Sequence, residues 1–398
     1  MTYNFDAKIN RKNTNSLKYD FAISRGKPHD ALPLWVADMD FQAPPCVLDA
    51  LKKSAEHGIF GYSETAEEYT SVLQDWFKRR FAWHIQPEWL VKTPGVVTAL
   101  HVAISGLTKP GDGVLIQQPV YPPFFSSITT TGRKPVINEL VQSGNSYVID
   151  FNDFEAKIIH ENVKIFILCS PHNPVGRVWT RDELIKLGDI CLKHGVIVIA
   201  DEIHADLVFD GHTQLVFADL KPEYLDITIT CTAPSKTFNV AGLHLANIFI
   251  ANPDMRNAFV TQYTASGLSQ SCGMGIVASK AAYKHGEDWL CQLLTYLTAN
   301  RDYLQNYLAS ELPQITMSDL QGTYLAWLDF RRFELSPAQL NDFISHKAKL
   351  WLVDGPAFGQ GGDGFQRINI GCTRATLQAA LERLKKALLK KALHFPLR

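Results

Sequence analysis

The sequence lacks several features that define other classes of protein. Its seven cysteines are scattered and form no C-x-x-C pair, which argues against a disulfide framework and against a structural zinc site. No apolar run approaches the roughly 20 residues of a membrane-spanning helix, and the N-terminus lacks the basic-then-apolar layout of a signal peptide. No internal repeat or low-complexity tract is present. We therefore expect a cytoplasmic protein in a reducing compartment.

An excess of charge of either sign is also absent. The net charge of −1 at pH 7 gives no reason to expect nucleic acid or an anionic membrane as a partner. The composition is that of an ordinary globular protein, with 46% hydrophobic and 20% charged residues. A chain of 398 residues is long enough for two domains, or for one large domain with an appended lobe. The sequence therefore favours a small-molecule ligand.

Short apolar strands alternate with amphipathic helices from Thr98 onward. The strands are predicted at 114–116, 163–169, 196–200 and 226–230. A helix is predicted at 67–81, and another opens on the capping box of Thr180 and Glu183 and ends near Gly195. Near-continuous apolar strands separated by helices are typical of a parallel sheet covered on both faces, so the fold class is α/β.

The pattern changes beyond about residue 288. A long amphipathic helix is followed by predicted strands at 324–330 and 365–370 and by a terminal helix at about 375–391. Residues 1 to about 30 are polar and turn-rich, as expected of an arm. We therefore expect a large domain over 46–288, and an N-terminal arm with a smaller α+β domain over 1–45 and 289–398.

Polar side chains follow the ends of four predicted strands: Tyr121, Asn173, Asp201 and Lys236. Each has an ordinary explanation when taken alone, as a core aromatic, a turn residue, a helix cap and a surface lysine. Together they would converge on one crevice at the carboxyl edge of the sheet, where α/β proteins bind their ligands. A lysine at this place is suited to form a Schiff base with a carbonyl cofactor.

The order and spacing of Asn173-Pro174-x-Gly176, Asp201 and Ser235-Lys236 resemble the fold-type I pyridoxal-phosphate enzymes, the aspartate aminotransferase superfamily. This resemblance covers nearly the whole chain. Five segments are more narrowly similar to the MalY/PatB group of cystathionine and cysteine-S-conjugate β-lyases: 34–41, 170–179, 201–209, 235–243 and 368–374. The resemblance implies a mostly parallel seven-stranded sheet covered by helices, a smaller α+β domain, and a homodimer with the active site at its interface.

The resemblance also implies roles for individual residues. Lys236 would hold pyridoxal 5'-phosphate and then act as the base on the substrate Cα–H. Asp201 would pair with the protonated pyridine nitrogen, and Asn173 would donate to the ring 3-oxygen. Tyr121 would lie on the ring face near the leaving group. His204 stands where many relatives have tyrosine or arginine, and we expect it beside the cofactor.

The phosphate of the cofactor would be bound at the start of a helix by Val96, Val97 and Thr98, together with the hydroxyl of Ser235. Tyr62 resembles the family tyrosine that reaches the phosphate across the dimer interface.

Two positions depart from the common pattern of the superfamily. Ala233 stands where a hydroxyl residue is usual, and His244 stands where many aminotransferases have arginine or lysine. The phosphate would then be bound more weakly, or Thr232 would share in binding it. A typical aminotransferase site is disfavoured.

Arg367 matches the family arginine that binds the substrate α-carboxylate with its bidentate fork. The backbone N–H of Ala37 would contact the same carboxylate, and Tyr121 and Asn173 would also line the substrate site. Arg374 is the alternative carboxylate ligand, although a structural role suits it better.

Two short patterns are set aside. Residues 359–364 fit G-x-G-x-x-G but precede a strand, so we interpret them as a mobile loop near the site. Glu202 and His204 lack further ligands at metal-binding spacing, and no metal is expected.

The resemblance to the MalY/PatB group implies a carbon–sulfur β-lyase that cleaves L-cystathionine or a related cysteine thioether to a thiol, pyruvate and ammonia. A class I/II aminotransferase would share every cofactor contact and stays open as an alternative. A regulator or scaffold with a vestigial site is a third possibility, which the intact set of Asn173, Asp201 and Lys236 argues against.

Overall fold

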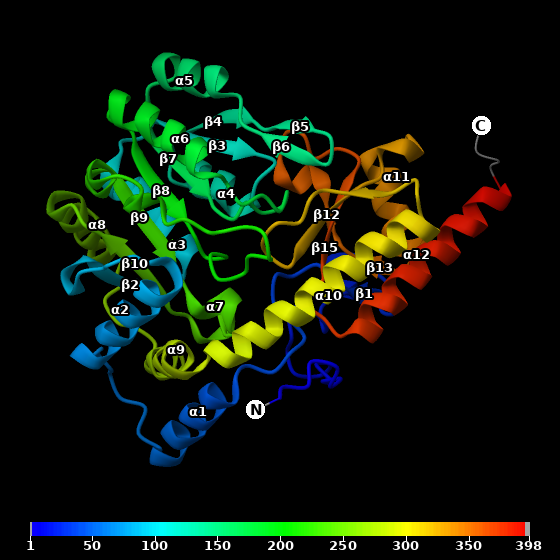
Figure 1. The fold of residues 1–398 in the computed structure, drawn as a ribbon, viewed down its shortest axis with the longest axis horizontal. Helices are drawn as coiled ribbons and strands as arrows, with labels where there is room; N and C mark the ends of the chain where they lie inside the picture. Colours follow the sequence, from blue (N-terminus) through cyan, green and yellow to red (C-terminus); the bar gives the residue numbers. More distant parts are fainter. Residues whose placement is uncertain (1, 395–398) are drawn as a thin grey trace.

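A seven-stranded sheet forms the centre of the larger lobe in the computed structural model, which describes residues 2–394 (Figure 1). The strands lie in the order β2 (Leu90–Thr93), β10 (Ala246–Ile250), β9 (Thr228–Thr232), β8 (Ile197–Asp201), β7 (Val163–Cys169), β3 (Gly113–Gln118) and β4 (Lys134–Glu139). Five of them, β9 to β4 in this order, run parallel, and β10 is antiparallel to both of its neighbours. The predicted mostly parallel α/β sheet is confirmed.

Helices cover both faces of this sheet because its strands are apolar on both sides. Along β3, Val114 and Ile116 pack into one core cluster, whereas Leu115 packs into another on the opposite face. The first face is covered by α3 (Val96–Leu107), α4 (Pro122–Thr130) and α8 (Pro253–Ala265), and the second by α5 (Phe151–His160) and α6 (Arg181–His194).

Local sequence signals place the helix boundaries accurately. The predicted helix 67–81 is α2 (Glu67–Phe81). Helix α6 has the expected capping box, in which the Thr180 hydroxyl accepts from the Glu183 N–H and the Glu183 carboxylate accepts from the Thr180 N–H. It ends at Gly195, whose φ of 65° lies in the left-handed region that glycine tolerates. Near this lobe lie α1 (Pro45–His57), α7 (Pro234–Thr237), α9 (Gly273–His285) and the hairpin of β5 (Val141–Ser143) and β6 (Ser146–Val148).

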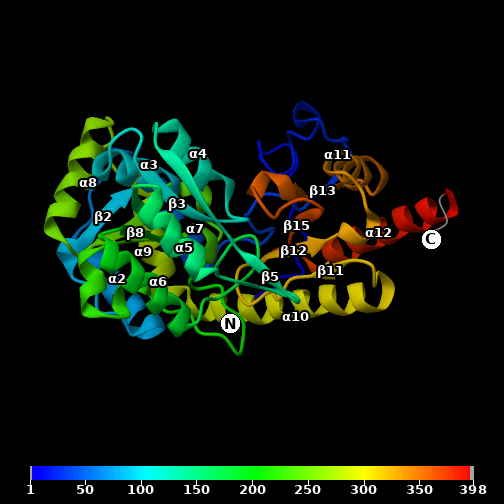
Figure 2. The ribbon, with the colours of Figure 1, turned by 90° about the horizontal axis from the view of Figure 1, so that it is seen from above.

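A long helix, α10 (Glu287–Glu311), runs from the larger lobe along the smaller one (Figure 2). The smaller lobe contains the antiparallel strands β11 (Thr316–Met317), β12 (Leu325–Asp329), β15 (Phe365–Asn369) and β14 (Val353–Asp354), with α11 (Pro337–Asp342) and α12 (Arg374–His394). The N-terminal segment joins this lobe, since β1 (Leu32–Pro33) pairs with β13 (Leu350–Trp351). We retain 46–288 as the proposed extent of the large domain.

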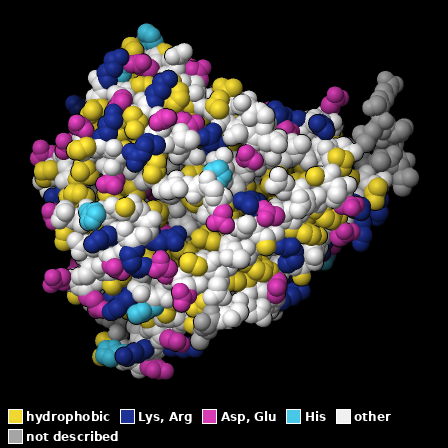
Figure 3. Space-filling view, viewed as in Figure 1, with side chains coloured by type: hydrophobic (Ala, Val, Ile, Leu, Met, Phe, Trp, Pro, Cys, Tyr) yellow, Lys and Arg dark blue, Asp and Glu magenta, His cyan; other side chains and the backbone are white. Residues whose placement is uncertain are grey.

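The surface carries charges of both signs. Lysine and arginine side chains are interspersed with aspartate and glutamate over the face seen in Figure 3. Within residues 2–394, no helix is both long and apolar enough to cross a membrane.

Candidate active site

The four polar residues predicted at strand ends lie at one edge of the sheet. Tyr121 follows β3, Asn173 follows β7, Asp201 closes β8, and Lys236 lies in the short helix α7 after β9. Since these four strands are mutually parallel, their carboxyl ends meet at the same edge. The charge of Asp201 acts on both Lys236 and Tyr121. The structure therefore brings the predicted set together.

Lys236 is held by a backbone carbonyl from the N-terminal part of the chain. Its Nζ donates a hydrogen bond of 2.7 Å to the carbonyl oxygen of Ala37. Burial lowers the pKa of Lys236 to about 8. The Arg367 guanidinium also lowers this pKa, whereas the carboxylates of Asp38 and Asp201 oppose the lowering. Roughly a tenth of the amine is therefore neutral, and nucleophilic, at pH 7, far more than for an exposed lysine.

Asp201 is a buried carboxylate with 5% of its surface exposed. Its Oδ1 accepts from the Ile203 N–H at 3.1 Å. Burial raises the pKa of Asp201 to about 7, and the Ile203 hydrogen bond and the charge of Lys236 only partly offset this rise. A buried carboxylate at the edge of a sheet, with its pKa raised so far, suits a cationic N–H partner such as a protonated pyridine nitrogen.

Arg367 lies in β15 of the smaller lobe and contacts both lobes. Its Nη1 donates to Asn173 Oδ1 at 2.9 Å, and its Nη2 donates to the carbonyl oxygen of Trp35 at 2.8 Å. The guanidinium carbon lies 5.0 Å from the centre of the Phe358 ring. Burial lowers the pKa of Arg367 to about 10, so the side chain stays cationic at neutral pH. Among the described residues, no hydrogen-bond partner faces its buried Nε.

His204 lies beside Tyr324, which in turn contacts Ala37. The two rings are 6.0 Å apart in an edge-to-face arrangement, and the Tyr324 hydroxyl donates to the Ala37 carbonyl oxygen at 2.9 Å. Burial lowers the pKa of His204 to about 3, so its imidazole is neutral. Its buried Nδ1 has no hydrogen-bond partner within residues 2–394. From the sequence, Tyr324 is expected only as a strand residue. Its contact with Ala37 is not predicted, because the two residues lie far apart in the sequence.

The predicted phosphate-binding residues lie where α3 begins. Val96, Val97 and Thr98 form its first turn, whose N–H groups have no partners within the helix. A Cβ built on Gly95 would meet nothing within 4 Å, so the approach to this turn is open. Ser235 lies in α7 beside Lys236.

Thr232 does not replace the missing hydroxyl at Ala233. Its Oγ1 donates to the Asn247 carbonyl oxygen at 2.9 Å inside the sheet, and the residue is 4% exposed. The expectation that Thr232 shares in phosphate binding is therefore not supported by its contacts, because the hydroxyl points into the strand pairing.

Three further predicted residues, Tyr62, Arg374 and Ala37, differ in how the structure places them. Tyr62 is 95% exposed in the single chain, and its neighbour Phe60 is 70% exposed, so the structure does not bring Tyr62 into the site of its own chain. Arg374 donates to Asn300 Oδ1 at 2.9 Å and ties α12 to α10, in agreement with a structural role. The contacts of Ala37 involve its carbonyl group, and the role predicted for its N–H stays a prediction.

The glycine-rich loop 359–364 packs on the end of β3. The Gln360 N–H donates to Gln118 Oε1 at 2.8 Å, and the Val120 N–H donates to the Phe358 carbonyl oxygen at 3.0 Å. A Cβ on Gly359 would lie 2.2 Å from the Gln118 side chain, so only glycine permits this approach. The loop is therefore tied to the larger lobe beside Tyr121.

Sequence reasoning missed two asparagines that fasten residues 36–41, here called the strap, to the site. Asn239 accepts from the Met39 N–H at 2.9 Å and donates to the Met39 and Phe41 carbonyl oxygens at 2.9 and 2.7 Å. Asn369 donates to the Val36 and Asp38 carbonyl oxygens at 2.6 and 2.7 Å. Both asparagines lie within segments that carry the family resemblance, close in sequence to Lys236 and Arg367. This proximity was the signal that could have identified them.

A family model described as aminotransferase class I and II matches residues 30–384. The chain belongs to this family. Cystathionine beta-lyase PatB of Bacillus subtilis is 43% identical over 97% of this chain and 100% of its own length. Protein MalY of Escherichia coli is 31% identical over 97% of this chain and 99% of its own length.

The solved structures agree with this family. Cystalysin of Treponema denticola, which contains a pyridoxal 5'-phosphate cofactor, superposes with a TM-score of 0.95 at 40% identity, covering 98% of this chain and 100% of its own. The protein is therefore a pyridoxal-phosphate-dependent enzyme of the MalY/PatB group of carbon–sulfur lyases. The residues present fit the cofactor, because a lysine amine, a buried carboxylate and an open helix start lie at one edge of the sheet.

Proposed function

We propose that the enzyme breaks the Cβ–S bond of L-cystathionine or of a related cysteine thioether. With cystathionine and one water molecule, the products would be homocysteine, pyruvate and ammonia. The proposal is supported chiefly by the placement of the Lys236 amine beside the buried Arg367 guanidinium, so that one substrate can reach both a base and a carboxylate ligand. The similarity to cystathionine beta-lyase PatB supports the choice of thioether.

The cofactor, when bound, supplies an electron sink that stabilises negative charge at the substrate Cα. Arg367 would bind the substrate α-carboxylate and orient the Cα–H bond toward Lys236. The neutral Lys236 amine would accept the Cα proton, which its lowered pKa favours at neutral pH. The departing sulfur would leave on the side of Tyr121.

Asp201 and Asn173 would orient the cofactor. The Asp201 carboxylate would pair with the protonated ring nitrogen of the cofactor. The positive charge of this nitrogen would stabilise the ionised form of Asp201. Asn173 already accepts from Arg367 through Oδ1, so its Nδ2 is the group that would donate to the ring oxygen. His204 is neutral and would contact the cofactor without adding charge. Val96, Val97, Thr98 and Ser235 would bind the phosphate.

The experiment that tests this function is pyruvate release from L-cystathionine by the purified enzyme with pyridoxal phosphate and no keto acid. We expect one pyruvate and one ammonia for each cystathionine consumed. Lys236→Ala should lose at least about a hundredfold in kcat, since a positioned base contributes that much. Turnover that starts only when a keto acid is added would contradict the proposal and identify an aminotransferase. Full activity of Lys236→Ala would contradict the mechanism.

A further inference from the structure

The N-terminal arm reaches the candidate active site through a group of charged side chains. Arg11 Nη2 lies 2.6 Å from Asp38 Oδ2, and Arg11 Nη1 lies 2.8 Å from Asp40 Oδ1. Lys18 Nζ lies 3.0 Å from Asp40 Oδ1, and the Tyr19 hydroxyl donates to Asp40 Oδ2 at 3.0 Å. These five residues, here called the arm cluster, set two cations against two carboxylates.

The arm cluster belongs to the interior of the protein. Lys18 is 0% exposed and Asp40 is 7% exposed, whereas Arg11 and Asp38 are about one-fifth exposed. Ion pairs at the surface contribute little to the free energy of unfolding, but a buried charge that loses its partner is strongly destabilising. The two aspartates in the otherwise apolar stretch 32–41 therefore take their partners from the arm, and the arm in turn holds the strap in place.

The strap connects the arm cluster directly to Lys236. Asp38 follows Ala37, whose carbonyl oxygen accepts from Lys236 Nζ at 2.7 Å and from the Tyr324 hydroxyl at 2.9 Å. Lys18 Nζ also donates to the Asp38 carbonyl oxygen at 3.3 Å. A shift of the strap would therefore move the acceptor that holds the amine.

The charges that face Lys236 come from several elements. They are Asp38 on the strap, Asp201 at the end of β8 and Arg367 on β15, and the neutral His204 lies nearby. Among these, Asp38 is the largest influence that favours the ammonium form. Its own position is set by Arg11, which contacts it through two nitrogens, and by Lys18, whose Nζ lies 3.6 Å from Asp38 Oδ1.

We propose that the arm cluster positions the Lys236 amine, so that Arg11 and Asp38 are positioning residues of the active site although they lie outside the sheet and the cofactor-binding elements. This proposal rests on pyridoxal phosphate as the cofactor and is independent of which substrate is cleaved. It makes the N-terminal arm part of the functional site.

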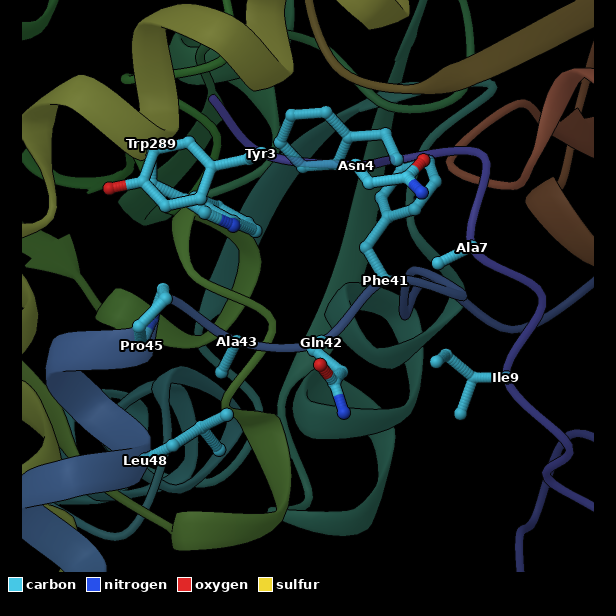
Figure 4. Close-up of a pocket in the computed structure, with 11 residues that line it drawn as sticks. Tyr3, Asn4, Ala7, Ile9, Phe41, Gln42, Ala43, Pro45, Leu48 and Trp289 are labelled. Carbon is cyan, nitrogen blue, oxygen red and sulfur yellow. The ribbon is translucent and has the colours of Figure 1, made fainter. Parts of the chain in front are cut away.

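The arm has a second, apolar attachment that allows the cluster to be tested by itself. The ring of Phe5 packs edge-on against Phe41 and Trp289, with centroids 5.1 and 5.6 Å away. Figure 4 shows residues of the arm, among them Tyr3 and Ile9, and Leu48 of α1 around a pocket of about 90 Å³ next to these rings. Loss of charge in the arm cluster should therefore leave the arm attached.

The test measures covalent attachment of pyridoxal phosphate to full-length apoenzyme, followed by absorbance from pH 6 to pH 11. Arg11→Gln and Asp38→Asn are compared with Lys12→Gln, which removes an exposed neighbouring charge outside the cluster. The rate at the high-pH plateau reports the orientation of the neutral amine, and the pH midpoint reports its pKa. Thermal unfolding monitors the fold.

We expect Arg11→Gln and Asp38→Asn to lower the plateau rate by about tenfold or more, as displacement of a reacting group does. Asp38→Asn should also move the midpoint to lower pH, because a charge that stabilises the ammonium is lost. Lys12→Gln should stay within about twofold of the native rate.

Plateau rates within about twofold of native in both cluster variants would overturn the proposal, as would a lower unfolding temperature with unchanged rates. If Arg11→Gln does not fold, Arg11→Lys, which keeps the charge but not the paired contact, is judged by the same rates. A missing cystathionine lyase activity would not affect this result, because no substrate is used.

Discussion

Arg367 contacts the larger lobe through Asn173, the N-terminal segment through the Trp35 carbonyl, and the ring of Phe358 in its own lobe. These contacts orient the planar guanidinium, whose rigid fork matches a carboxylate. A lysine at this position would keep the charge but could not make the same set of contacts. Charge and geometry at this residue can therefore be separated by experiment.

Arg367→Lys should raise the KM for an amino-acid substrate by roughly 10- to 100-fold, with a smaller change in kcat. The loss corresponds to one hydrogen bond to a charged group, about 1.5–3 kcal/mol. Steady-state kinetics of pyruvate release measure it. The control is Arg374→Lys, whose arginine contacts Asn300 on α10, and its KM should not change. An unchanged KM in Arg367→Lys would assign the carboxylate to another residue.

Contacts at the ends of helices in the larger lobe keep the segments that carry the site residues in place. Helix α7, which carries Lys236, is fastened where Thr237 donates to Asp206 Oδ2 at 3.0 Å, and Asp206 in turn contacts Arg80 of α2. Helix α6 follows the segment that carries Asn173 and begins at a capping box. The capping box lies at the start of this helix, after the segment of Asn173, so we expect it to contribute to stability and not to the chemistry of the site.

Thr180→Ala should lower the free energy of unfolding by about 1 kcal/mol, the usual cost of an N-cap. The hydroxyl that accepts the Glu183 N–H is lost, while Glu183 keeps its ion pair with Arg177. Urea unfolding measures the change. Arg181→Ala, one residue later and exposed, serves as the control and should change stability by less than about 0.5 kcal/mol. Equal stabilities for Thr180→Ala and the native protein would show that the cap contributes nothing.

At the scale of the whole molecule, the segment around Tyr62 is the clearest exposed apolar feature. Ile59, Phe60 and Tyr62 are 74%, 70% and 95% exposed in the single chain. We propose that this segment is covered in a homodimer and that Tyr62 reaches the phosphate site of the partner subunit. The active site would then be complete only in the dimer.

Sedimentation equilibrium should give twice the mass of the chain. Tyr62→Phe should keep the dimer but raise the Kd for pyridoxal phosphate by about tenfold, since one hydroxyl contact to a charged group is lost. Tyr307→Phe is the control, because that hydroxyl contacts Glu382 in the smaller lobe. A monomer that binds the cofactor with the native Kd would contradict the proposal.

The sequence by itself determined the fold class, the approximate bounds of several elements and, through the family resemblance, the cofactor. Strand 163–169 and helix 67–81 follow from local hydrophobic periodicity, which depends only on residues close together in the sequence. The order and spacing of Asn173, Asp201 and Lys236 along the chain predicted the family. The family model and the solved structures confirmed it.

Only the tertiary structure decided which groups surround Lys236. The two aspartates of the strap needed partners, but nothing in the sequence pointed to Arg11 and Lys18. The acceptor for Lys236 is the carbonyl of Ala37, and a backbone carbonyl is present at every residue and leaves no mark in the sequence. The contact between Lys236 and Ala37 joins residues 199 positions apart and depends on where folding brings the chain.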